Sequence, residues 1–344
     1  MPRNAHDLLH QTFSRYPGTL RSALEICAAS EIPDFEHVKA LQESPADFDT
    51  YYRGALRELS APLSISRSAL MFRLLLCAGT RFAERDCRIP VREEVLTGLL
   101  RGSIGFFLDA VNAHASDGEA MPLEIYAADL NVRSRERDTG GDIAFFFDMS
   151  GSTREPLIFP VCFQAKRSNP APGETQSIRR INKSDKIGDH QLVKLKALAA
   201  KNWNCAYLFY HNDMDDLLPE PVLPLVKSID DIASAPSELD VDLEENTADL
   251  ASYVLHLVNT GQNAITDLTG LDAAAQALVG KDIDQIVVLS SNPDIARRLK
   301  MTVPQLEKQH EPFRAVGVDA NRVFAQASSY ANTYTLRARS LPTP

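Results

Sequence analysis

The order of apolar segments in the middle of the chain restricts its fold more than any other feature of the sequence. Strand-like runs there are bounded by turn residues and interleaved with two longer segments that have helical spacing. The helical segments span residues 91–114 and 189–201, and the strand-like runs span residues 123–130, 142–149, 161–166 and 205–210. This order of helix, three strands, helix and strand predicts an α/β core around a mixed four-stranded sheet.

Turn residues set the expected limits of the strands. Gly140 and Gly141 open the second run, and residues 150–156 are rich in turn formers that connect it to the third. Pro160 has no N–H to donate to a sheet, so we expect the third strand to start at Val161.

Helical regions are expected on both sides of this core. Apolar residues at helical spacing between residues 65 and 77 predict that residues 1–87 form a helical N-terminal region. The core is expected to span residues 88–212. Residues 213–344 are expected to form an acidic linker and a mainly helical C-terminal region with one short strand-like run at 285–289.

The net charge of −10 is unevenly distributed along the chain. Residues 131–202 hold thirteen Lys and Arg against eight Asp and Glu, whereas residues 211–250 hold twelve acids and a single base, Lys227. The overall charge argues against a protein that simply coats nucleic acid, because phosphate binding requires local positive potential. We interpret the acidic stretch as a solvated surface or linker, with mimicry of nucleic acid as the alternative.

Composition argues against a membrane or secreted protein. No apolar run approaches the ~18–20 residues that a membrane-spanning helix needs. The first residues include acid and amide side chains where a signal peptide is apolar. Five cysteines, an odd number without zinc-site spacing, indicate reduced thiols. We therefore expect a cytoplasmic protein without a membrane partner.

Three polar residues at the ends of neighbouring strand-like runs suggest a chemical site. Asp142 opens the second run, and Gln164 and Lys166 share one face of the third, because strand side chains alternate between faces. If the two strands pair, an acid, an amide oxygen and an ammonium group converge. An acid beside a carbonyl oxygen is a ligand set for Mg²⁺, and an adjacent lysine can orient or activate an attacking water. The alternative is that Asp142 only serves the turn after the two glycines.

This arrangement resembles the PD-(D/E)xK nuclease superfamily, which has the restriction-endonuclease-like fold. Within it, the chain is most similar to the branch in which Gln replaces the acid of the second half-motif. That branch includes type IV, methyl-dependent restriction enzymes and related phage-defence nucleases. The resemblance covers about residues 88–212 and implies a metal-dependent endonuclease that hydrolyses phosphodiester bonds of DNA in restriction or anti-phage defence.

The resemblance also implies roles for individual residues. Asp142, Gln164, Lys166 and a glutamate on the preceding helix, Glu93, would be catalytic. Asp142, Gln164 and Glu93, with the main chain of Ala165 as a further candidate, would bind Mg²⁺ or Mn²⁺.

Other residues are weaker candidates for the same site. We prefer Glu93 to Glu94 because it lies at the edge of the apolar stripe of its helix, although both acids also suit the helix dipole. Glu136 matches an acid of relatives in this branch. Gln191 is expected to face the site from the following helix and to contact the nucleic acid, or to be an ordinary surface amide.

DNA is the expected partner, with RNA as an alternative substrate. Arg179, Arg180 and Lys183 lie in the polar connection before the second helix and are candidate DNA contacts; the alternative is that they only balance the acidic stretch. A second copy of the chain or a protein of a defence system is a further partner class that the resemblance allows. The competing function is a catalytically silent nuclease-fold protein that binds nucleic acid or acts as a scaffold, because an amide oxygen is a poorer metal ligand than a carboxylate.

Overall fold

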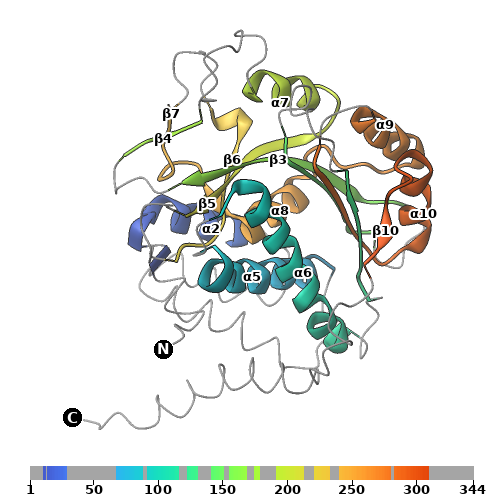
Figure 1. Cartoon of the computed structure of the whole chain (residues 1–344), viewed down its shortest axis with the longest axis horizontal. Coiled ribbons are helices and arrows are strands. Elements are labelled where there is room, and N and C mark those ends of the chain that lie inside the picture. Colours follow the sequence, from blue (N-terminus) through green and yellow to red (C-terminus); the bar gives the residue numbers. More distant parts are fainter. Residues whose placement is uncertain are drawn as a thin grey trace.

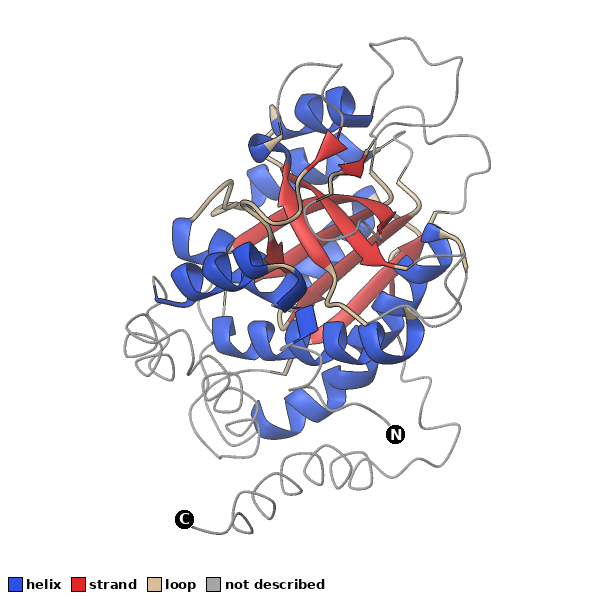
Figure 2. Cartoon of the chain, turned by 90° about the vertical axis from the view of Figure 1, so that its left-hand side faces the viewer, coloured by secondary structure: helices blue, strands red, loops and turns tan. Residues whose placement is uncertain are grey.

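The computed structural model has an α/β architecture in which one mixed sheet lies between two layers of helices (Figures 1 and 2). The residues that the structure describes are 11–12, 14–28, 67–87, 91–115, 122–130, 141–150, 155–168, 174–178, 191–212, 221–232, 240–279 and 283–309.

The described helices come from all three regions of the sequence. They are α2 (Pro17–Ala28), α5 (Arg67–Arg81), α6 (Glu93–Ala115), α7 (Gln191–Ala199), α8 (Leu250–Thr260), α9 (Leu268–Leu278) and α10 (Pro293–Thr302), with a π-helical turn η4 (Phe82–Asp86) and a 3₁₀ turn η6 (Ile229–Asp231). The predicted segments at 91–114 and 189–201 are therefore helices, with ends that differ from the prediction by a few residues. No helix in these ranges is both long and apolar enough to cross a lipid bilayer.

The strands include the four that were predicted and several more. They are β1 (Glu124–Asp129), β2 (Ile143–Asp148), β3 (Ile158–Ser168), β4 (Gln176–Ser177), β5 (Asn204–His211), β6 (Leu225–Ser228), β7 (Asp240–Val241), β8 (Ala248–Asp249), β9 (Gln285–Ser290) and β10 (Glu307–Lys308). Eight of them form one sheet in the order β10-β1-β9-β2-β3-β5-β6-β8, and β4 pairs with β7 separately.

The main sheet is larger than the predicted four strands, and its order differs in the centre. β9, which follows β2 by well over a hundred residues, lies between β1 and β2, parallel to β2 and antiparallel to β1. The first and second predicted strands are therefore not neighbours. Hydrophobic periodicity identified the run at 285–289 as a strand, but periodicity carries no information about which distant strand it pairs with.

Pro160 lies within β3, which begins at Ile158, so the predicted start at Val161 is wrong. In this part of β3, the backbone groups of odd-numbered residues face β2. Met149 N donates to Leu157 O at one end, and Asp142 N donates to Phe163 O at the other. Backbone groups of successive residues point to opposite edges of a strand, so the nitrogen of the even-numbered Pro160 faces away from β2. It lies just before the ladder with β5 begins, and the missing N–H breaks no strand pairing.

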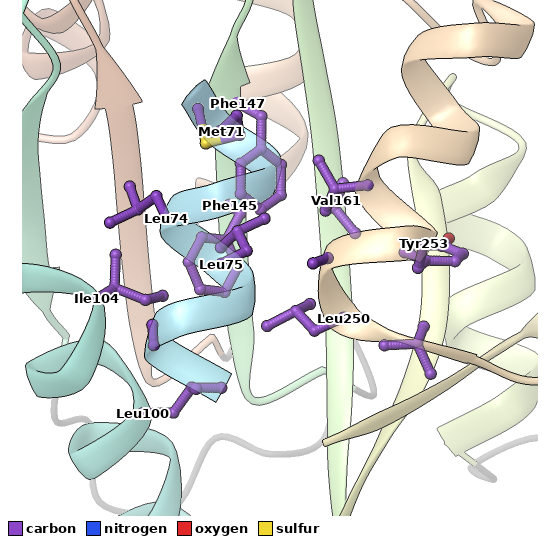
Figure 3. Packing of buried hydrophobic residues seen from close by; sticks show 14 of the residues in the cluster. Met71, Leu74, Leu75, Leu100, Ile104, Phe145, Phe147, Val161, Leu250 and Tyr253 are labelled. Atoms are coloured by element: carbon purple, nitrogen blue, oxygen red, sulfur yellow. The ribbon is translucent and has the colours of Figure 1, made fainter. Parts of the chain in front are cut away.

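The two faces of the sheet bury separate sets of apolar side chains because successive residues of β2 point to opposite sides. Phe145 and Phe147 pack with side chains of α5, α6 and α8, as Figure 3 shows. Phe146 points the other way and meets Trp203 at a ring-centroid distance of 5.2 Å, in the layer with α7, α9 and α10. Each fully buried Phe contributes about 1.5–3 kcal/mol to the free energy of unfolding.

The far end of β2 is also tied to β9. The buried Asp148 accepts hydrogen bonds from the backbone N of Ser150, at 2.9 Å, and from the hydroxyl of Ser290 at the end of β9. The strand is thus anchored to β9 beyond its backbone ladder.

The described part of the acidic stretch is folded against the sheet. β6 and β8 extend the sheet beyond β5, and the ammonium of Lys227 on β6 donates to the carbonyls of Asp242 at 2.8 Å and Glu245 at 2.6 Å. Burial lowers the pKa of Lys227, whereas the acids Asp231, Asp242 and Glu245 raise it. The single base of this stretch therefore holds the loop that carries Asp242, Glu244 and Glu245.

We predict that residues 88–212 do not fold alone. Without β9, the buried strand β2 has an unpaired edge, and without α5 and α8 the phenylalanines of β2 lose most of their cover. A fragment of residues 88–212 should show no cooperative urea transition by circular dichroism and poor amide dispersion by NMR, whereas the full chain should show both a transition and dispersed amides. A cooperatively unfolding 88–212 fragment would contradict this prediction.

Candidate functional site

The start of β2 and the far part of β3 bring two of the predicted residues into contact. Ile143 pairs with Phe163, and the backbone N of Asp142 donates to the carbonyl of Phe163 at 2.8 Å. The next positions, Asp142 and Gln164, therefore lie opposite each other. Gln164 Nε2 donates to Asp142 Oδ2 at 2.6 Å, and both side chains are buried.

The backbone of Ala165 completes this contact. Its N–H donates to Asp142 Oδ2 at 2.8 Å, and its carbonyl accepts a second hydrogen bond from Gln164 Nε2 at 3.2 Å. A single amide nitrogen thus lies between a carboxylate oxygen and a main-chain carbonyl oxygen.

β9 holds the backbone of Asp142 from the other side. The carbonyl of Asp142 accepts from the N–H groups of Asp284 and Gln285, each at 3.2 Å. The carboxylate of Asp284 also raises the pKa of Asp142, so Asp284 belongs to the electrostatic environment of the site. Asp284 was not predicted from the sequence. An acid directly before the strand-like run at 285–289 was visible, but its proximity to Asp142 depends on the insertion of β9 beside β2.

Gly141 permits the close approach of β2 and β3 at this point. A Cβ atom at Gly141 would clash with Cys162 Sγ and would lie 3.4 Å from the carbonyl of Phe163 and 3.8 Å from Leu195 Cδ2 on α7. The glycine before Asp142 is therefore required by packing against β3.

Glu93 reaches β3 from the first turn of α6. Its Oε1 accepts a hydrogen bond from the backbone N of Arg167 at 3.0 Å, and its carboxylate raises the pKa of Asp142. Glu94 is exposed. Thr97, one turn further along α6, donates to the carbonyl of Glu93 at 3.0 Å and contacts the hydroxyl of Tyr210 on β5 at 3.0 Å. The structure thus brings Glu93, and not Glu94, beside β3.

Burial dominates the electrostatics of Asp142 and raises its pKa to about 8. The half-buried Lys166 and the N–H of Ala165 lower this pKa, while the carboxylates of Glu93 and Asp284 raise it. The carboxyl group is therefore largely protonated at neutral pH in the absence of a cation. A cation that binds it must displace that proton.

Gln191, the first residue of α7, is buried rather than at the surface. Its Oε1 has no hydrogen-bond partner among the residues that the structure describes. Gln191 shares a helix face with Leu195, which lies close to the Gly141 backbone. The amide therefore lies on the face of α7 that packs near the site.

Four of the predicted residues lie outside the described part of the chain. They are Glu136, Arg179, Arg180 and Lys183.

The described residues contain no group of three or more His, Cys, Asp and Glu side chains arranged to hold a metal ion. A cation at this site would therefore need oxygen ligands of another kind beside Asp142. The carbonyl of Ala165 and the amide oxygen of Gln164 are oxygens of that kind, and hard divalent cations accept both.

None of the protein-family models, curated proteins or solved structures compared with the chain matches it. Function therefore has to be inferred from the residues of the site and their geometry.

We predict that Gly141→Ala destabilises the protein by about 1–3 kcal/mol, the usual cost of overpacking a well-packed core. The cause is the clash with Cys162 Sγ, so Cys162→Ala should restore part of the loss in the double variant. Urea unfolding of the wild type, both single variants and the double variant measures this coupling. Additive effects of the two substitutions would show that the contact is not the cause.

The raised pKa of Asp142 predicts a pH dependence of stability. Between its unfolded value near 3.8 and its folded value of about 8, only the unfolded state ionises, so rising pH favours unfolding. We expect the wild type to lose stability relative to Asp142→Asn by up to about 1.4 kcal/mol for each pH unit in this window. Urea unfolding of both proteins in EDTA from pH 5 to pH 8 measures the difference, and parallel pH profiles would contradict the assignment.

Proposed function

We propose that this protein is a divalent-cation-dependent nuclease of the restriction-endonuclease-like kind, which hydrolyses phosphodiester bonds of DNA in restriction or anti-phage defence. The observation that supports this proposal best is the meeting of Asp142, the Gln164 amide and the Ala165 carbonyl at one point, with Lys166 on the same strand face as Gln164.

The donor set fits Mg²⁺ or Mn²⁺. Gln164 Nε2 lies 2.6 Å from Asp142 Oδ2 and 3.2 Å from Ala165 O, so two hard oxygen atoms already point at one position. Asp142, Ala165 O and the Gln164 amide oxygen would hold the cation there, with water and substrate phosphate as further ligands. When bound, such a cation supplies Lewis-acid stabilisation of the charge that develops on the phosphate.

The charges around this position favour the same cation. The carboxylates of Glu93 and Asp284 each raise the pKa of Asp142, and Lys166 is the one base among the groups that shift this pKa. A divalent cation would offset this excess of negative charge and stabilise the ionised form of Asp142.

The proposed reaction adds one water across a phosphodiester bond. The water oxygen bonds to phosphorus, the P–O bond to one sugar breaks, and the leaving oxygen gains a proton. Lys166 orients the attacking water and offsets negative charge in the transition state. Glu93, fixed by the N–H of Arg167, keeps its second oxygen for a water molecule or the cation.

A second candidate function has a specific observation in its favour. The amide of Gln164 satisfies both Asp142 and Ala165 O without any cation, and Asp142 is largely protonated at neutral pH. A site whose oxygen atoms are already hydrogen-bonded within the protein also suits a catalytically silent nuclease-fold protein that binds nucleic acid or serves as a scaffold.

We predict that Asp142→Ala and Lys166→Ala each lower the rate of supercoiled-plasmid nicking by at least about 100-fold in Mg²⁺ or Mn²⁺. Gln164→Glu should retain cation-dependent activity, because it supplies a carboxylate. Lys300→Ala, on the exposed face of α10, is the control for loss of a lysine. EDTA should abolish nicking, and a parallel assay on single-stranded RNA decides the substrate.

Unchanged nicking rates in folded Asp142→Ala or Lys166→Ala would reject the site. DNA binding by the wild type without cleavage in either cation would favour the silent alternative.

A further inference from the structure

The site belongs to a row of polar side chains that crosses five neighbouring strands. Gln164 on β3 pairs with Tyr207 on β5, and Tyr207 pairs with Lys227 on β6. On the other side of Gln164 lie Asp142, at the start of β2, and then Asp284, before β9. Residues at paired positions share one face of a sheet, so these side chains emerge on the α7 face.

The next row on the same face is apolar. Ala144, Cys162 and Cys205 occupy paired positions on β2, β3 and β5 and are buried in the layer beneath α7 and α9. The polar row is therefore not a general property of this face.

Tyr207 is the member of the row whose polar group lacks a partner. Its side chain is fully buried, and its hydroxyl makes no hydrogen bond within the described part of the chain. Asp142 and Gln164 bond to each other, and Lys227 donates to two carbonyls. Buried hydroxyls are nearly always paired, so an unpaired one points to a partner that this state of the molecule does not provide.

The amide of Gln164 has two chemically different ends. In this structure Nε2 donates to Asp142 Oδ2 and to Ala165 O. A cation between these two oxygens would require the amide to present Oε1, because an amide N–H is not a metal ligand. Nε2 would then turn away from Asp142 and require a new acceptor.

We propose that Tyr207 is this acceptor, so that its hydroxyl oxygen receives the hydrogen bond of Gln164 Nε2 when a divalent cation binds the site. Tyr207 is then a positioning residue: it acts on the cation only through the orientation of the Gln164 amide. This inference rests on the cation site of the proposed function.

The strand pairing favours Tyr207 over another buried acceptor without a partner among the described residues, Gln191 Oε1. Neighbouring strands lie about 4.8 Å apart, and Tyr207 is paired directly with Gln164 on the same face. Gln191 Oε1 is also buried without a partner among the described residues, but it belongs to α7, in the layer above the sheet. If Tyr207 is the acceptor, Tyr207→Phe weakens cation binding; if Gln191 is the acceptor, Gln191→Leu does so instead.

The test is a titration of Mn²⁺ binding at fixed pH, in which the electron paramagnetic resonance signal measures the concentration of free Mn²⁺. We expect Tyr207→Phe to weaken binding by about 3- to 10-fold, the effect of losing one neutral hydrogen bond. In the Gln164→Glu background the same substitution should have no effect, because a carboxylate presents oxygen in either orientation. Tyr253→Phe, which removes a buried hydroxyl from α8 beneath the other face, is the matched control.

A measurement without metal ions separates positioning from a purely structural role. The hydroxyl has no partner within the described residues in that state, so Tyr207→Phe in EDTA should melt at the same temperature as the wild type or higher. A lower melting temperature would show that the hydroxyl has a structural partner and would overturn the inference.

The remaining outcomes are also decisive. Wild-type Mn²⁺ affinity in Tyr207→Phe, equal losses in the wild-type and Gln164→Glu backgrounds, or a loss in Gln191→Leu alone would each overturn the role of Tyr207 and leave the cation site intact. If neither the wild type nor Gln164→Glu binds Mn²⁺, the proposed cation site fails, and this inference fails with it.

Discussion

The complete burial of β2 is the constraint from which much of this structure follows. All six residues of the strand are buried, so its backbone groups need partners on both edges and its side chains need cover on both faces. β3 supplies one edge from the next segment of sequence. The other edge is filled by β9, and α5 and α8 join α6 in covering one face, so the core includes segments from both flanks.

The same constraint fixes the site. Asp142 directly precedes β2 and therefore lies between the same two neighbours. β3 contributes Gln164 and the N–H of Ala165, and Asp284 and Gln285, at the start of β9, donate their N–H groups to the carbonyl of Asp142. The carboxyl group is held from several directions but is removed from water, which raises its pKa. The position is thus rigid and energetically costly, a combination that is common where a residue is retained for chemistry.

The sequence was sufficient to predict features that depend on neighbouring residues, such as the alternation of side chains along β2 and β3. Alternation along the strands was enough to predict that Asp142 and Gln164 meet on one side of the sheet if the two strands pair. The exact register, with Asp142 opposite Gln164, came from the structure. The start of β3 was mispredicted because the cost of Pro160 depends on which neighbour its nitrogen faces. Asp284 and Tyr207 were missed because their relation to Gln164 and Asp142 depends on the order of strands from distant parts of the chain, which no single segment encodes.

The position of β9 also affects how the chain is made. Ile143 pairs with Gln285, so the ribosome must add about 140 further residues before this edge of β2 can be filled. At translation rates of ~5–20 residues per second, that delay is on the order of 10 s. During this time the nascent chain carries an unpaired edge next to Phe145, Phe146 and Phe147, a sequence suited to intermolecular strand pairing. While the chain is being synthesised, these phenylalanines therefore lack the strand that completes their sheet in the finished protein.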